Sequence, residues 1–139
     1  MKTKEPVCII KDKKQLVKLL KEWQHRLFLD DWIIKAVIVD KEELDEDVAG
    51  HNSFIFTNKT AIIKLAKIDE EDNDRIAKCC MEYTLVHELL HCKMNLFSNS
   101  NTDYESAYLE AHEHQLLDEM AKSLIMAKYN IDLNWFKNF

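Results

Sequence analysis

The interpretation of this chain starts from the stretch His87-Glu88-Leu89-Leu90-His91, an H-E-x-x-H pattern. Two imidazoles four residues apart on a helix lie on one face, about 5–6 Å apart at Cβ. Both can then reach one zinc ion at roughly 2.0–2.1 Å. The carboxylate between them projects beside the metal, where it can take a proton from a water molecule. The spacing therefore predicts His87 and His91 as zinc ligands and Glu88 as a general base.

A catalytic zinc needs a third protein ligand and one position open to water. The downstream candidates are Glu110, Glu113 and His114, which lie three and four residues apart on or near one helix face. The gaps from His91 to Glu113 and to His114 are twenty-one and twenty-two residues, so a short loop allows an antiparallel return of the chain. His114 would complete a three-histidine site and Glu113 a His₂Glu site, with Glu110 as the next candidate.

Periodicity around this motif predicts an α+β domain that spans residues 1–139. Apolar residues recur at helical spacing over 11–29, from Glu71 to about Phe97, and from Asp103 to about Tyr129. Between the first two helices, β-branched or alternating runs predict strands at 32–39, 51–57 and 60–66, the last two as a hairpin. The sequence thus predicts an N-terminal helix, a small and mostly antiparallel sheet of three or four strands, the H-E-x-x-H helix and a C-terminal helix that carries the third ligand.

Composition removes several classes of protein. With 139 residues, 47% hydrophobic, the chain has enough apolar residues for one core. One Gly and one Pro argue against turn-rich β folds and glycine-rich nucleotide sites. The net charge of −6 argues against a nucleic-acid partner, and no apolar run approaches the length of a membrane span. The four cysteines fit no zinc ribbon, and no signal peptide precedes them, so we expect reduced thiols in a cytoplasmic protein.

In layout the chain resembles a minimal zincin, and it is similar to small metallopeptidases of phages and mobile elements related to the SprT-like and ImmA/IrrE-like groups. In those families an acidic third ligand lies near the start of a stretch such as E-Q-x-x-x-x-L-A. Here Gln115 and Met120-Ala121 fit that register, which puts His114 where the families have Glu and leaves Glu113 one residue off.

The resemblance implies a metallopeptidase with one Zn²⁺ per chain that hydrolyses a peptide or protein substrate. It further implies a strand edge near the metal that pairs with extended substrate, for which 60–66 is the candidate. The alternative is a non-catalytic zinc-binding regulatory or interaction protein that retains the zincin fold. Glu88 argues against that alternative, because holding a metal does not require this carboxylate.

Overall fold

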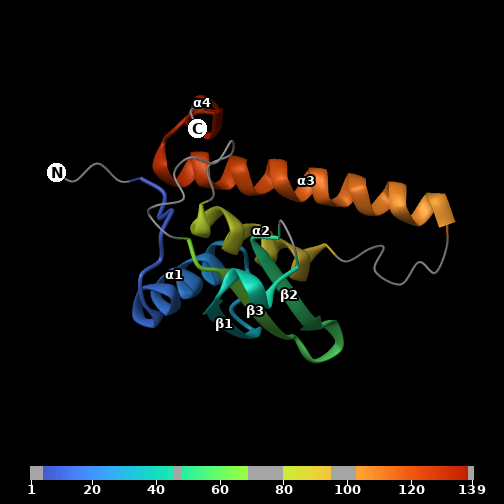
Figure 1. Ribbon diagram of the computed structural model, residues 1–139, viewed down its shortest axis with the longest axis horizontal. Coiled ribbons are helices and arrows are strands. Elements are labelled where there is room, and N and C mark those ends of the chain that lie inside the picture. Colours follow the sequence, from blue (N-terminus) through green and yellow to red (C-terminus); the bar gives the residue numbers. More distant parts are fainter. Residues whose placement is uncertain (1–4, 46–47, 69–79, 95–102, 138–139) are drawn as a thin grey trace.

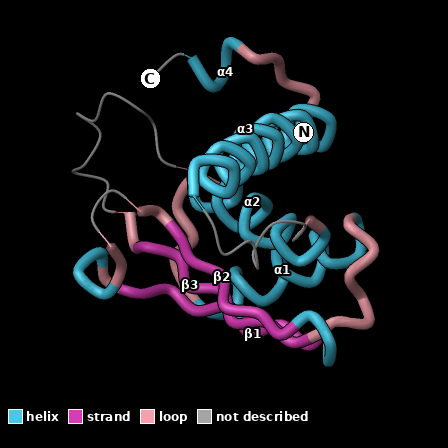
Figure 2. The backbone as a smooth tube through the Cα atoms, turned by 90° about the vertical axis from the view of Figure 1, so that its right-hand side faces the viewer, coloured by secondary structure: helices cyan, strands magenta, loops and turns pink. Residues whose placement is uncertain are grey.

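A computed structural model describes residues 5–45, 48–68, 80–94 and 103–137. Their elements are α1 (Lys13–Arg26), β1 (Ile33–Val39), the short 3₁₀ helix η1 (Lys41–Glu43), β2 (Gly50–Ile55), the 3₁₀ helix η2 (Phe56–Asn58), β3 (Thr60–Ala66), α2 (Met81–Lys93), α3 (Asp103–Tyr129) and α4 (Asn134–Lys137). Helices α1 and α2 cover one face of the sheet, and α3 lies on the far side of α2 (Figures 1 and 2). The predicted α+β class is therefore confirmed.

The sheet has three strands in the order β1-β3-β2. Strands β2 and β3 pair antiparallel as the predicted hairpin, whereas β1 pairs parallel with the other side of β3. The sheet is thus mixed, and the prediction of a mostly antiparallel sheet was wrong. The physical reason is the apolar inner face of β3, where Ala61, Ile63 and Leu65 are almost completely buried. At the centre of the sheet this strand buries the most apolar surface. Residues 60–66 are therefore paired on both sides and have no free edge, so the prediction that they form a substrate-pairing edge was also wrong.

The first helix follows its sequence pattern closely. Asp12 caps it, because its carboxylate accepts a 2.8 Å hydrogen bond from the backbone N–H of Gln15. Its buried side chains all lie on the face toward the sheet and α2: Leu16, Leu19, Leu20 and Trp23. This face belongs to the same hydrophobic core as β1 and β3, and thereby connects the N-terminal part of the chain to the metal-motif helix.

Helix α2 begins at Met81, not at Glu71 as predicted, because Cys80 is already extended at φ −126° and ψ 116°. The helix begins here because the N-terminal segment satisfies its first N–H groups: Met81 donates to the carbonyl of Cys8 and Glu82 to that of Val7, both at 3.0 Å. The predicted helical residues 71–79 and 95–97 lie outside the described residues. Helix α2 ends at Lys93.

Most side chains of α2 are buried, in keeping with a helix enclosed by the sheet, α1 and α3. The half-buried ones are Tyr83, His87 and His91, which recur every four residues. They form a single stripe along the helix. Both histidines of the metal motif therefore lie on the partly accessible side of the helix, whereas Glu88 is buried.

Helix α3 runs antiparallel to α2 and extends beyond its end (Figure 1). It agrees with the predicted range of 103–129. Leu117, Ala121 and Ile125 are buried against the core, whereas Leu116 is 44% exposed. The four-residue helix α4 was not predicted. None of the helices in the described ranges combines the length and the apolar character that crossing a bilayer would require.

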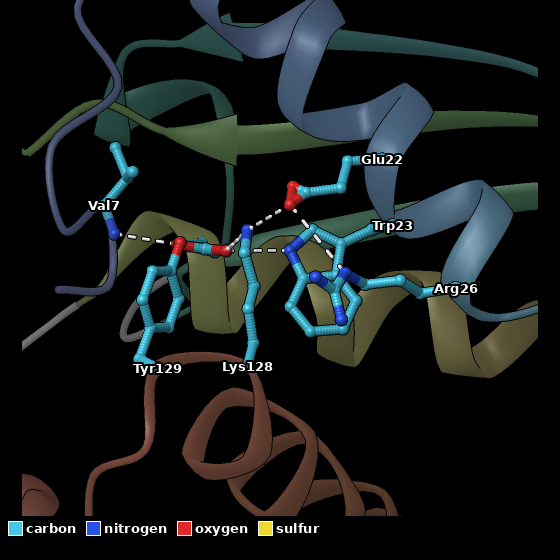
Figure 3. Close-up of polar contacts among 7 residues, drawn as sticks. Val7, Glu22, Trp23, Arg26, Lys128 and Tyr129 are labelled. Carbon is cyan, nitrogen blue, oxygen red and sulfur yellow. Dashed lines mark hydrogen bonds and ion pairs between the residues drawn. The ribbon is translucent and has the colours of Figure 1, made fainter. Parts of the chain in front are cut away.

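A buried carboxylate ties α2 to both ends of the chain. Glu82 is fully buried and accepts hydrogen bonds from the Trp23 indole and the Lys128 ammonium, each at 2.8 Å, and from the Tyr129 hydroxyl at 2.5 Å. The backbone N–H of Val7 donates the fourth, at 2.8 Å. Figure 3 labels the four donors, Val7, Trp23, Lys128 and Tyr129, and marks their contacts with dashed lines. Since a buried charge is tolerated only when it is paired and hydrogen-bonded, this Glu82 cluster fixes the end of α3 against the start of α2.

Candidate metal centre

Three imidazoles meet where α3 passes over the half-buried stripe of α2. His87 and His91 come from α2 and His114 comes from α3, and one nitrogen from each lies within 4.8 Å of the other two. The ring centroids are 5.0 Å apart for His87–His91, 5.7 Å for His87–His114 and 5.1 Å for His91–His114. Antiparallel packing of the two helices therefore brings His114 beside His87 and His91, which is the position that a third ligand needs.

The electrostatics of the pair on α2 favour neutral rings. Burial, reinforced by the neighbouring charges of His87 and His114, lowers the pKa of His91 to about 4. Burial also lowers the pKa of His87, although the charge of Asp118 opposes that shift. A neutral imidazole has a nitrogen lone pair available, which is the form that binds a metal.

The donor set fits zinc. Three nitrogen donors with a fourth position left open is the ligand set of catalytic zinc sites. Tetrahedral ligands at about 2.0–2.1 Å from the metal are roughly 3.4 Å apart, so nitrogens within 4.8 Å of one another need only small ring movements to converge. His87, His91 and His114 are therefore the residues that could hold a metal ion.

Asp118 is a site residue that the sequence analysis missed. Its Oδ1 lies 2.9 Å from Nδ1 of His87. This approach lacks hydrogen-bond geometry, so Nδ1 is a buried nitrogen without a hydrogen-bond partner among the described residues. The contact is therefore electrostatic, and the carboxylate lies where it can orient the His87 ring. The available signal was the spacing of His114 and Asp118, four residues apart and so on one face of α3.

Tyr83, also missed, holds Asp118 in place. Its hydroxyl donates a 2.5 Å hydrogen bond to the same Oδ1 that approaches His87. Burial and the Asp118 carboxylate together raise the pKa of Tyr83 well above its usual range, so the phenol stays protonated and remains a donor. Tyr83 precedes His87 by four residues on the half-buried stripe of α2. The chain Tyr83–Asp118–His87 thus connects the two helices directly beside the three histidines.

Glu88 lies on the side of α2 that faces β2. It is 8% exposed, and its Cγ would lie 3.3 Å from a Cβ added to Gly50. Burial, with a smaller contribution from the charge of Asp118, raises the pKa of Glu88 to about 7. The Asn52 side-chain amide donates a 2.7 Å hydrogen bond to the backbone carbonyl of Glu88. Strand β2 therefore packs directly on the motif, with the only glycine of the chain at the closest point.

The other candidate ligands lie outside the histidine group. Glu113 is half-buried but is not among the three residues whose donor atoms converge, and Glu110 is exposed. Burial raises the pKa of Glu113, and the nearby His114 opposes the shift. Of the remaining histidines in this region, His51 and His112 are exposed, and His112 packs its ring against Tyr108 at 4.4 Å.

The assembled group offers three imidazole nitrogens, an orienting carboxylate and a buried glutamate next to one of the histidines. Such a set can bind a divalent metal and supply a proton acceptor close to it. A comparison with the models of known protein families, with curated proteins and with solved structures finds no match to this chain in any of the three.

Proposed function

We propose that the protein is a zinc-dependent metallopeptidase. The observation that carries the proposal is the convergence of His87, His91 and His114 from two helices, with donor atoms within 4.8 Å of one another. Three protein ligands leave a coordination position for water or substrate, which distinguishes a catalytic zinc site from a closed structural one. Zinc, when bound, supplies Lewis-acid polarisation of a substrate carbonyl and makes water more acidic.

The protein's own residues would then bind the metal, orient its ligands and transfer the proton. His87, His91 and His114 hold the metal, and Asp118 orients the His87 ring. Glu88 accepts the proton of the attacking water and returns it to the leaving amine. Its burial between α2 and β2 keeps the carboxylate out of bulk water. A positioned base acts most effectively in such a water-excluded site.

The sheet also supports the handling of a peptide. Among the described residues, strand β2 pairs only with β3, and it packs against α2 beside Glu88. An exposed strand edge can bind an extended peptide through backbone hydrogen bonds. The strand edge beside the site is therefore that of β2, in place of the segment 60–66 that the sequence suggested.

The proposal is tested by peptide hydrolysis with zinc-loaded and zinc-free protein, beside the zinc-loaded Glu88→Gln variant. The amide keeps the size of the side chain but cannot accept the proton, and loss of a general base costs on the order of 10²–10⁴ in rate. We expect hydrolysis by the zinc-loaded wild type alone, with zinc content unchanged in Glu88→Gln. The exposed Glu42→Gln substitution in η1 is the matched control. Equal rates for Glu88→Gln and the wild type would remove Glu88 from the mechanism.

A further inference from the structure

A hollow opens between the C-terminal end of α2 and residues 109–119 of α3, and its lining residues are close in sequence to His91 and His114. Among the described residues it is lined by Met94 and by side chains of α3 that include Leu109, Glu113, Leu116 and Glu119. Met94 follows His91 by three residues, about one helical turn, and Glu113 immediately precedes His114. The hollow therefore borders the metal-binding residues on both helices.

The apolar side chains of the hollow are incompletely covered. Leu116 is 44% exposed, and Met94 and Leu109 are half-buried. They offer a surface on which an aliphatic chain could pack. Because methionine is unbranched and adaptable, Met94 suits contact with a flexible ligand.

Two carboxylates accompany this apolar surface. Glu113 and Glu119 line the hollow and form no ion pair within the part of the chain that the structure describes. Glu110 adds a further negative charge near Glu113. His112 is the only basic side chain among the lining residues. The hollow therefore combines apolar contact surface with unneutralised negative charge.

We propose that this hollow binds a long basic side chain, lysine or arginine, of a residue next to the scissile bond; the inference rests on the metallopeptidase function. Lysine and arginine carry an aliphatic stem that packs on apolar surface and a cation that stays at the polar rim. The stem contacts Met94, Leu109 and Leu116, and the cation lies between Glu113 and Glu119. An acidic side chain at that position would meet two like charges, which discriminates against it.

The test is a binding measurement that requires no turnover. Zinc-loaded Glu88→Gln protein is titrated into three fluorescent alanine-based peptides that differ at one central residue: lysine, norleucine or glutamate. Norleucine has an aliphatic stem without the charge. We expect the lysine peptide to bind at least tenfold more tightly than the norleucine peptide, and the glutamate peptide to bind most weakly. Equal affinities for lysine and norleucine would overturn the proposal.

Two variants locate the preference. In the same protein, Glu113→Gln and Glu119→Gln should each reduce the ratio of lysine to norleucine affinity several-fold, while the affinity for norleucine changes less than twofold. The exposed Glu42→Gln change in η1 should leave the ratio unaltered. A ratio that survives both substitutions would place the basic residue elsewhere and contradict the assignment.

Hydrolysis separates this inference from the function on which it rests. If wild-type protein cleaves a peptide library without enrichment of lysine or arginine beside the cut, the hollow assignment is wrong and the peptidase function stands. If the lysine peptide binds preferentially but the zinc-loaded wild type cleaves no peptide, the peptidase function is wrong. In that case the hollow remains a binding site for basic side chains.

Discussion

Oδ1 of Asp118 lies 2.9 Å from Nδ1 of His87, and the same oxygen accepts a 2.5 Å hydrogen bond from Tyr83. One carboxylate oxygen on α3 therefore contacts two members of the stripe on α2. A carboxylate that accepts the ring N–H of a metal-binding imidazole holds the ring in one orientation and raises its basicity, and loss of such a partner typically costs 10–100-fold in metal affinity. At 2.9 Å, a small rotation of the His87 ring would complete such a hydrogen bond. Asp118 thus links the packing of the two helices to the geometry of the proposed metal site.

The first prediction follows from this contact. Asp118→Asn preserves the shape of the side chain but removes the negative charge that faces His87. We expect about 10–100-fold weaker zinc binding with an unchanged far-ultraviolet circular dichroism spectrum, measured by competition with a chelator. Asp40→Asn is the control, because Asp40 is exposed and makes no side-chain capping hydrogen bond. Zinc affinity equal to that of the wild type would show that Asp118 has no part in positioning His87.

The second prediction concerns the Glu82 cluster. Glu82→Gln removes the charge that the Lys128 ammonium faces at 2.8 Å, in a position where the carboxylate is fully buried. Breaking a buried ion pair by removing one partner typically costs about 3–5 kcal/mol. We expect a loss of that order in the free energy of unfolding of zinc-free protein in urea.

Tyr129→Phe provides a graded comparison within the same cluster. It deletes one 2.5 Å hydrogen bond to Glu82 and leaves the ion pair in place. A hydrogen bond to a charged group contributes about 1.5–3 kcal/mol, so the loss should be smaller than for Glu82→Gln. If Glu82→Gln were no less stable than the wild type, the cluster would not hold α2 and α3 together.

The third prediction uses the close approach of β2 to α2. A Cβ on Gly50 would lie 2.6 Å from Cγ2 of Thr84 and 3.2 Å from the Lys64 carbonyl oxygen. Gly50→Ala should therefore destabilise the protein by about 1–3 kcal/mol, the usual cost of overpacking. Thr84→Ser removes the nearest methyl group, so the double variant should recover part of this loss in urea unfolding. If the double variant lost as much stability as the two single variants combined, the result would contradict the contact between Gly50 and Thr84.

The sequence predicts best those elements whose bounds depend on the pattern of their own residues. Helix α3 was predicted over its full range, and β3 at its observed bounds, because their apolar residues recur with a regular period. The start of α2 was predicted ten residues too early. Its N-terminus is set by Val7 and Cys8, whose carbonyls accept its first N–H groups from a distant part of the sequence. Periodicity contains no information about such a contact.

Packing between elements accounts for the remaining differences. The position of β1 beside β3 depends on which strand buries most apolar surface, and hairpin signals report only on neighbours in the chain. Likewise, Tyr83 and Asp118 acquire a role only when α3 lies against α2. The choice between His114 and Glu113 rested on register against similar families, and the structure brings His114 to the pair on α2.

The central claim is that His87, His91 and His114 hold one zinc ion. The most direct test is a zinc titration with chelator competition on the wild type, His114→Ala and Glu113→Ala. We predict one zinc per chain in the wild type, a steep loss of affinity in His114→Ala and a much smaller change in Glu113→Ala, because only His114 has a donor atom within 4.8 Å of both other histidines. A folded wild-type protein that binds no zinc at neutral pH, or a His114→Ala variant that binds zinc as tightly as the wild type, would contradict the account.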